Sequence, residues 1–304
     1  MRIGAAPQNN TRRRNKQTGF CSRRCGPDFD ERGMSMIKTE LKRAFCSIPY
    51  WVTSAITLVL LAIGSSDYLP LPYATIKLPR EWWIYYFHCF FLGMKTLLPV
   101  FYPIVVMIPY VLSYRRDRDS GYKQLILLKS SRRSYLGAKL LAVSASAFGA
   151  ILLPSLAWIP VCRLLGDTDW DHARKYYAHN FLFAPSFYEE HVVLYCVMYA
   201  FHAAFLGAVF AVFGLGLSAV IKNRYLALLL PFCYAVFSSA ILSTLFHNTF
   251  IGCSFEAMNL MPLQSYYYKR TYPLGFWTVP VYEAGLTAVG LALYLGGDYH
   301  AGKA

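Results

Sequence analysis

The chain has 304 residues, of which 56% are hydrophobic and 15% are charged, and its formal net charge is +14. This composition excludes a water-soluble globular enzyme, an intrinsically disordered chain and a small disulfide-stabilised scaffold. The charged residues leave five uncharged runs of 19 to 31 residues, and a helix of about 20 apolar residues crosses the hydrocarbon core of a bilayer. The sequence therefore predicts an all-α, polytopic membrane protein.

The first segment, residues 1–33, is polar, basic and without apolar periodicity, which predicts a disordered tail. Met34 and Met36 offer alternative translation starts at its end. A pair of cysteines lies in the tail, but no second pair of ligands is nearby, so we expect no bound metal. The structured domain is predicted to cover residues 34–304.

A short helix is predicted from Met36 to Pro49, because apolar residues recur there at helical spacing between basic ones. We expect it to lie in the interface on the cytoplasmic side of the membrane. Three prolines, among them Pro103, are expected to kink the second membrane span. Six transmembrane helices are predicted in all, at about residues 48–66, 92–114, 140–162, 192–221, 225–246 and 276–295.

Positive charges gather on one side of this arrangement. If the N-terminus is cytoplasmic, 22 of the 30 lysines and arginines fall in cytoplasmic segments, in agreement with the positive-inside rule. Both termini are then cytoplasmic. We interpret the basic residues as determinants of topology that contact anionic membrane lipid, and we expect no nucleic-acid partner.

The cytoplasmic loop between the second and third predicted spans has the most specific pattern. Ser120 is placed to cap a short helix over residues 121–128, and Ser130 or Ser131 to cap the helix that enters the next span. The apolar run Leu125–Leu128 is costly to expose to water, so we expect it to dock on this chain's own helices, on lipid or on another protein. An ordinary basic loop is the alternative.

This loop resembles the coupling loop of membrane subunits of bacterial ATP-binding-cassette (ABC) transporters, of the type-two exporter permease class. Those subunits read acidic–x–acidic–x–Gly–Thr, then a leucine-rich stretch, then small–x–Arg, and a lysine at the base of the third span. This chain departs from the pattern in having Tyr122 where Thr is preferred and in lacking a proline before the small–x–Arg element. The loop residues in question are Asp117, Asp119, Gly121, Tyr122, Leu125, Leu127, Leu128, Ser131, Arg132, Arg133 and Lys139.

The resemblance implies that the loop is a coupling helix, which sits in a groove of a separate ABC ATPase subunit and transmits nucleotide-driven closure to the spans. It also implies a second permease chain, as a homodimer or heterodimer, in the bacterial cytoplasmic membrane. No phosphate-binding loop occurs in the sequence, so ATP and magnesium are expected on the partner. We therefore expect a transport subunit that binds no cofactor and is not an enzyme.

Glu283 lies inside the last predicted span, where a carboxylate is costly unless it is paired or hydrated. We expect it to line a substrate path or gate, with Lys95 or Arg163 as its partner and with the kink at Pro103 beside the same path. Hydration of Glu283 near the outer interface is the alternative. His202, also within a span, is expected to be a hydrogen-bonded packing residue, with a proton relay as the alternative.

These observations favour the membrane subunit of an ATP-driven exporter for a peptide, lipid or drug-like substrate. Two other classes remain open. A membrane-embedded enzyme that modifies lipids or acyl groups would use acidic and histidine side chains of the outer loops. A non-transporting scaffold or sensor would bind a partner through the cytoplasmic loop. An ATPase partner distinguishes the exporter from the enzyme.

Overall fold

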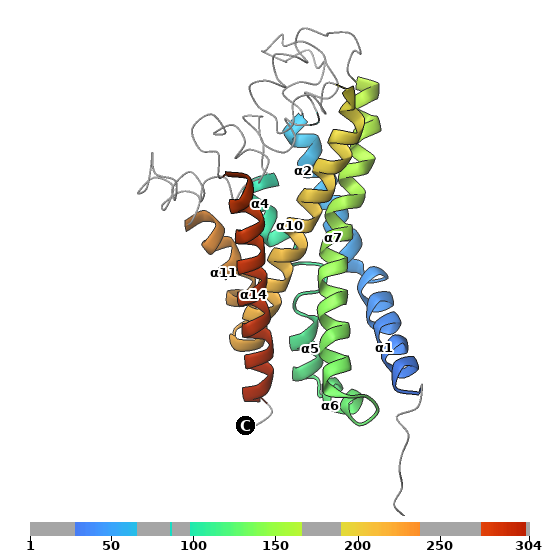
Figure 1. Ribbon diagram of the computed structural model, residues 1–304, viewed down its shortest axis with the longest axis vertical. Coiled ribbons are helices and arrows are strands. Elements are labelled where there is room, and N and C mark those ends of the chain that lie inside the picture. The colour runs from blue at the N-terminus through green and yellow to red at the C-terminus, as the bar shows by residue number, and fades with distance from the viewer. Residues whose placement is uncertain (1–27, 66–85, 87–97, 166–189, 238–274, 302–304) are drawn as a thin grey trace, which may run out of the picture.

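The computed structural model describes residues 28–65, 86, 98–165, 190–237 and 275–301, whose regular secondary structure is all helical (Figure 1). The helices pack into one elongated bundle. They are α1 (Asp28–Phe45), α2 (Ile48–Ser65), α4 (Leu98–Val105), α5 (Ser113–Asp119), α6 (Tyr122–Leu127), α7 (Arg132–Leu165), α10 (Val192–Val220), α11 (Arg224–Val236) and α14 (Gly275–Ala301).

Three of the described helices, α2, α7 and α10, are long and apolar enough to cross a membrane. They coincide with the spans predicted at 48–66, 140–162 and 192–221 and confirm a helical protein with membrane-spanning potential. The prediction of six spans is not supported. Among the described residues α11 has only 13 residues, and α14, although 27 residues long, carries two carboxylates. The remainder of the span predicted at 225–246 lies outside the described residues.

The prediction of one continuous helix over residues 92–114 is wrong. Helix α4 ends at Val105, residues 106–112 form turns, and α5 begins at Ser113. Pro109 lies in these turns and has no N–H to donate to a preceding carbonyl, which favours a break over a kink. Pro103 lies inside α4 and is buried, as the sequence indicates, while residues 92–97 are outside the described part of the chain.

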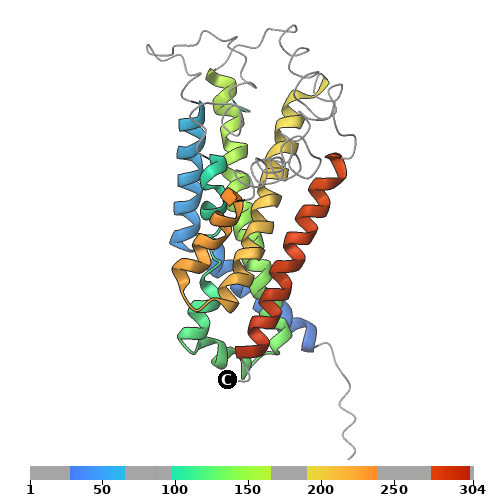
Figure 2. The same ribbon diagram turned by 90° about the vertical axis from the view of Figure 1, so that its left-hand side faces the viewer.

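Helix α1 begins at Asp28, within the segment 1–33 for which the sequence predicts a disordered tail; residues 1–27 lie outside the described residues. It packs chiefly on α7 (Figure 2). Cys46 and Ser47 separate it from α2, which continues the chain and also packs on α7. The helix expected from Met36 to Pro49 is thus two helices, with a junction between them beside the middle of α7 (Figure 1).

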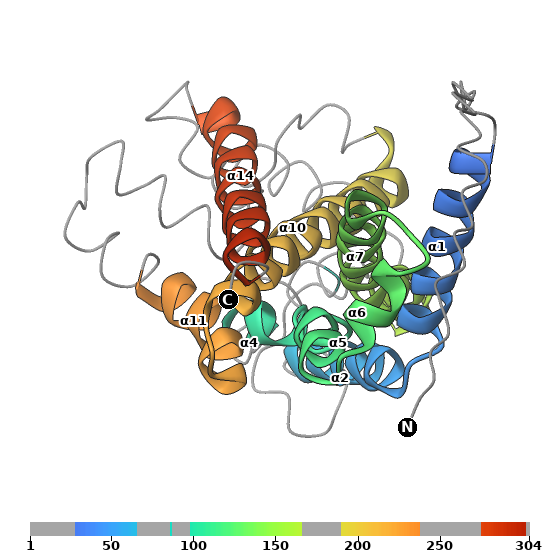
Figure 3. The ribbon, with the colours of Figure 1, turned by 90° about the horizontal axis from the view of Figure 1, so that it is seen from below.

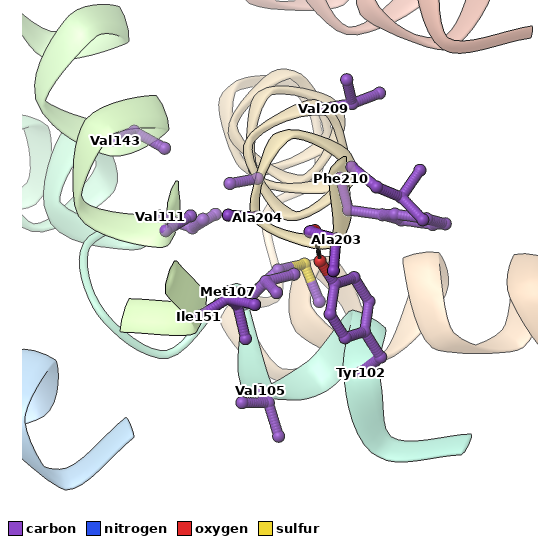
Figure 4. Packing of buried hydrophobic residues seen from close by; sticks show 14 of the residues in the cluster. Tyr102, Val105, Met107, Val111, Val143, Ile151, Ala203, Ala204, Val209 and Phe210 are labelled. Carbon is purple, nitrogen blue, oxygen red and sulfur yellow. Dashed lines mark hydrogen bonds between the residues drawn. The ribbon is translucent and has the colours of Figure 1, made fainter. Parts of the chain in front are cut away.

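The centre of the bundle is α10, which packs most extensively against α14 and α7. Viewed along the bundle, α11 and α14 lie on one side and α1 on the other (Figure 3). Around α10 the core is apolar: Tyr102, Met107, Ile151 and Phe210 are buried beside one another (Figure 4). The hydroxyl of Tyr102 donates to the carbonyl of Ala203, so α4 is fixed to the middle of α10.

Helices α5 and α6 lie together at the lower end of the bundle in Figure 1, beside the beginning of α7 and the end of α14. We call this the charged end, because the buried residues Glu40, Asp117, Lys139 and Asp298 all lie there. The predicted cytoplasmic loop thus folds against the bundle, and its side chains enter the interior.

Candidate functional site

A buried lysine is the centre of the charged end. Lys139, in the second turn of α7, is 0% exposed. Its Nζ lies 2.7 Å from Oε2 of Glu40 on α1 and 2.6 Å from Oδ2 of Asp117 on α5. An ammonium group removed from water needs such partners, because an unpaired buried charge is very costly. The sequence predicts both Asp117 and Lys139 as loop residues, and the structure brings them into direct contact.

Arg43 completes this group as a second cation. Its guanidinium contacts Glu40 at 2.8 Å and Asp117 at 3.1 Å. Burial by itself lowers the pKa of Arg43, but the hydrogen bond to Asp117 and the neighbouring negative charges outweigh it and raise the pKa, so the side chain stays charged. The group of Glu40, Arg43, Asp117 and Lys139, here called the Lys139 cluster, therefore pairs two carboxylates with two cations.

Two tyrosines close the remaining sides of the Lys139 cluster. Tyr110 donates a hydrogen bond of 2.8 Å to Glu40, and Tyr135 donates one of 3.3 Å to Asp117. The ammonium group of Lys139 also lies over both rings, 4.8 Å from the centroid of Tyr110 and 5.7 Å from that of Tyr135. The cluster is hydrogen-bonded on all three helices that supply it, which fixes α1, α5 and α7 relative to one another.

A second buried charge, Asp298, joins α14 to the loop. The carboxylate is 0% exposed and forms ion pairs with Lys123 of α6 and Arg132 of α7. Tyr114 of α5 donates a further hydrogen bond of 2.7 Å. Burial alone raises the pKa of Asp298, but the hydrogen bonds from Lys123, Tyr114 and Arg132 outweigh it, so the pKa lies below its ordinary 3.8. These four residues are called the Asp298 cluster.

The lowered pKa of Asp298 gives a testable pH dependence. A depressed folded-state pKa stabilises the fold above the unfolded value of about 4, and this stabilisation is lost as the pH falls through the folded value. We expect Asp298→Asn to lower the unfolding temperature of the detergent-solubilised protein at pH 7 and pH 5 alike. As the pH falls below about 4 the wild type should progressively lose its advantage. Asp119→Asn, at an exposed carboxylate, is the control; a difference for Asp298→Asn that persists unchanged at pH 3 would contradict the assignment.

The short helix α6 presents part of its apolar run to solvent. Leu125 is 62% exposed and Leu128 is 84% exposed, whereas Ile126 and Leu127 pack against the core of the bundle. Helical spacing explains the division, since residues three apart share a face and the two between them point elsewhere. The predicted docking residues are thus only partly free: Leu125 and Leu128 are accessible to a partner, and Leu127 serves the fold.

The turn before α6 differs from the sequence-based prediction. Ser120 forms no cap to α6; instead Gly121 precedes the helix in the left-handed conformation, with φ of 73°. A residue with a Cβ rarely adopts this conformation, which explains a glycine at this place. At the start of α7 the prediction is confirmed in one of its two forms, because the Ser131 hydroxyl accepts a hydrogen bond from the Ser134 amide.

The loop is also attached to the end of α10. Arg115 of α5 donates to the carbonyl of Ile221, and Arg118 donates to that of Ala219 at 3.2 Å. The last carbonyls of a helix have no partner within the helix, so these arginines satisfy them and complement the negative end of the helix dipole. Asp119 is half-exposed and pairs with the same two arginines on the surface.

The other candidate residues lie apart from the charged end. Glu283 pairs with His202, whose Nε2 is 3.1 Å from Oε1, so its partner is not the expected Arg163. The contact agrees with the expectation that His202 is a hydrogen-bonded packing residue. Lys95, the other expected partner, lies outside the described residues. Arg133 is exposed, and Tyr122 lies beneath the guanidinium of Arg43 at 4.8 Å.

Sequence reasoning missed Glu40, Arg43, Tyr110, Lys123 and Asp298 as site residues. A signal was present for the two acidic ones. Glu40 falls among Ile37, Leu41 and Ala44 on the apolar side of its helix. Asp298 continues a four-residue spacing of buried positions through Leu286, Gly290 and Tyr294. A carboxylate at a buried helical position predicts a partner, although not which one.

The buried carboxylates of both clusters are paired with fixed cations, and these pairs join the short helices α5 and α6 to α1, α7 and α14. Comparison with known proteins adds no family: no protein-family model, curated protein or solved structure gives a significant match to the chain.

Proposed function

We propose that this chain is the membrane-spanning subunit of an ATP-driven ABC export system in a bacterial cytoplasmic membrane. ATP and magnesium bind a separate ATPase subunit, and a second permease chain completes the transport path. The observation that carries the proposal is the form of α6: Leu125 and Leu128 face solvent, while Lys123 pairs with the buried Asp298 of α14. Ile126 and Leu127 pack against the core of the bundle.

The exposed side of α6 suits a reversible protein interface. Leu125 and Leu128 form a small apolar patch, and Gln124, Lys129 and Arg133 around it are exposed and polar. Apolar side chains at the centre of an interface stabilise the contact, and charges at its rim guide association. A patch of this kind fits an apolar groove with an acidic rim on the ATPase subunit.

The buried clusters give α6 a mechanical connection to the bundle. Lys123 on α6 is paired with Asp298 at the end of α14, and Arg132 pairs the beginning of α7 with the same carboxylate. Helix α5, which precedes α6, is held to α1 and α7 by Asp117 and to α10 by Arg115. A displacement of α6 by a partner therefore acts on α7, α10 and α14 together, as coupling of ATP hydrolysis to transport requires.

The orientation of the chain follows from its charge. The exposed lysines and arginines around α6, and Lys222 and Arg224 beside the end of α10, lie at the charged end. The positive-inside rule assigns this end to the cytoplasm, where the ATPase subunit and ATP are found. In this arrangement α11 and α14 are also membrane helices, and α1 lies at the cytoplasmic interface.

Substitution of the two exposed leucines tests the proposed interface. We expect Leu125→Asp/Leu128→Asp to weaken binding of the ATPase subunit by more than about 30-fold, the effect of losing about 2 kcal/mol from the centre of an interface. The unfolding temperature should remain that of the wild type, because both side chains are exposed. The measurement is co-purification of an ATP-hydrolysing subunit from native membranes in mild detergent.

The matched control is Gln124→Asp/Lys129→Gln, which changes the charge of α6 by the same amount and leaves both leucines in place. We expect this control to retain the ATPase subunit. Equal loss in both variants would assign the effect to charge and contradict an apolar docking patch. An active chain that never co-purifies with an ATPase favours the membrane-embedded enzyme.

A further inference from the structure

His202 of α10 and Glu283 of α14 meet in the middle of two apolar helices. The two side chains are 31% and 8% exposed, and Nε2 of His202 is 3.1 Å from Oε1 of Glu283. At a rise of about 1.5 Å per residue, both lie about 27 Å from the charged end of their helices. The pair is therefore separate from the Lys139 and Asp298 clusters, and the proposed coupling function does not use it.

The other ionisable groups near the pair are phenols, one on a neighbouring helix and one on α14 itself. Tyr102 of α4 and Tyr282 of α14 are near enough for electrostatic interaction with Glu283. Both hydroxyls are engaged elsewhere: Tyr102 donates to the carbonyl of Ala203, and Tyr282 accepts a hydrogen bond of 3.0 Å from Tyr234 of α11. Phenols stay neutral near pH 7, so none of them balances the charge of Glu283.

No fixed cation replaces His202 as the partner of Glu283 within the described part of the bundle. The middle of α7, residues 140–162, and all of α2 contain no Asp, Glu, Lys or Arg. The charges of α5 lie at the charged end, where they are bound to other groups. His202 forms the one ion-pair contact within 4.0 Å of Glu283 among the residues that the structure describes.

The charge of the pair depends on the number of protons that it holds. With no added proton, a carboxylate faces a neutral imidazole and the pair carries one negative charge. With one proton, the pair is neutral overall, either as a carboxylate and an imidazolium or as a carboxylic acid and an imidazole. With two protons it carries one positive charge. Apolar surroundings favour the neutral pair, because an uncompensated buried charge is costly.

We infer that His202 and Glu283 form a proton-binding site between α10 and α14. The ligand is a single proton, shared by an imidazole and a carboxylate inside the apolar part of the bundle. Histidine is the side chain whose protonation changes near neutral pH, and the carboxylate beside it provides a counter-charge for the imidazolium. This site operates whether or not an ATPase subunit binds α6.

The backbone contact of α10 and α14 gives the site a structural consequence. Towards the charged end the two helices touch at Gly216 and Gly290, where a Cβ on either residue would collide with the backbone of the other helix. His202 and Glu283 bridge the same two helices farther from that end. Loss of the proton removes the ion pair but leaves the glycine contact, so it weakens the attachment between the outer parts of α10 and α14 while their inner parts stay together.

The test is the pH dependence of thermal unfolding between pH 5 and pH 8 for the full chain in detergent. For the wild type we expect the unfolding temperature to fall by at least about 2 °C as the pH rises, because the carboxylate loses its counter-charge. In His202→Gln and in Glu283→Gln the unfolding temperature should decrease much less between pH 5 and pH 8 than it does in the wild type. The exchange variant His202→Glu/Glu283→His keeps one imidazole and one carboxylate, so it should show the pH dependence of the wild type again.

The matched control is His191→Gln at the beginning of the same helix, which should keep the wild-type pH dependence. The proposal would be overturned if the unfolding temperature of His202→Gln decreased with pH as much as that of the wild type. If the single variants do not fold, a folded exchange variant that lacks pH dependence also overturns it. For the wild type alone, ¹⁵N-histidine spectra in lipid nanodiscs give a second readout: the proposal is overturned if no solvent-protected imidazole changes protonation between pH 5 and pH 8.

Discussion

Replacement of Lys139 by methionine should destabilise the protein by about 3–5 kcal/mol, the cost of removing one partner from a buried ion pair. The ammonium group is fully buried and is the shared partner of Glu40 and Asp117, so Lys139→Met leaves two buried carboxylates with Arg43 as their remaining cation. The free energy of unfolding in denaturant, measured in detergent, checks this expectation. Methionine is close to lysine in length, so little of the loss should come from packing.

Two further variants distinguish the ion pair from a general effect of losing a lysine. Lys129→Met removes an exposed lysine from the same region and should change the stability by less than about 0.5 kcal/mol. Glu40→Gln added to Lys139→Met removes one of the two uncompensated carboxylates, and Arg43 then balances Asp117 alone. This double variant should regain about 1–3 kcal/mol relative to Lys139→Met. Additive losses for the two substitutions would contradict the proposed cluster.

Gly290→Ala should weaken the contact of α10 and α14 and destabilise the protein by about 1–3 kcal/mol, the usual effect of overfilling a packed interior. A Cβ at this position would lie 2.8 Å from Cα of Phe213 and 2.9 Å from the carbonyl oxygen of Val212. Backbone atoms of a neighbouring helix move only if the helices separate. The unfolding temperature and the accessibility of the interface to cysteine labelling both report this separation.

The matched control is Gly285→Ala, five residues earlier in α14, where an added Cβ meets nothing within 4 Å. Alanine is a better helix former than glycine by about 1 kcal/mol, so this control should be neutral or stabilising. The two substitutions are chemically identical and differ only in their surroundings. Equal effects on stability would show that α10 and α14 are not in backbone contact at Gly290.

The sequence predicted the long helices well because their signal is local. Uncharged runs and apolar composition located α2, α7 and α10, and the end of α7 nearest the loop coincides with the predicted Ser131 cap. The break at residues 106–112 was less predictable. Prolines indicated disturbed hydrogen bonding, but whether a helix kinks or stops depends on what packs around it, and here buried residues such as Met107 bind the turn to α10.

The contacts of the candidate site were only partly predictable, because they join residues distant in sequence. Asp117 and Lys139 were identified by the loop pattern, yet Glu40, the second carboxylate that pairs with Lys139, lies 99 positions before it. His202 and Glu283 are separated by 81 positions, and the places of the charged residues along the sequence pointed to Lys95 or Arg163 as the partner. Helical spacing indicates that a charge is buried, whereas the identity of its counter-charge depends on tertiary packing.

The apolar run Leu125–Leu128 shows the same limit at short range. The sequence indicated a run that must be covered, but it did not divide the run between the fold and a partner. The structure places Leu127 against the bundle and leaves Leu125 and Leu128 outside. The Leu125→Asp/Leu128→Asp variant therefore leaves Leu127 in place, because substitution of Leu127 would perturb the fold together with any interface.

The most direct test of the proposed function is ATP hydrolysis by the assembly purified from native membranes through this chain. The chain contains no phosphate-binding loop, so hydrolysis in such a preparation belongs to a partner. For the wild type and the Gln124→Asp/Lys129→Gln control, ATPase activity is expected to co-elute with the chain in size-exclusion chromatography. The Leu125→Asp/Leu128→Asp variant is expected to remain folded but to elute without ATPase activity. A wild-type assembly that is intact, stable and without ATPase activity would contradict the proposed function.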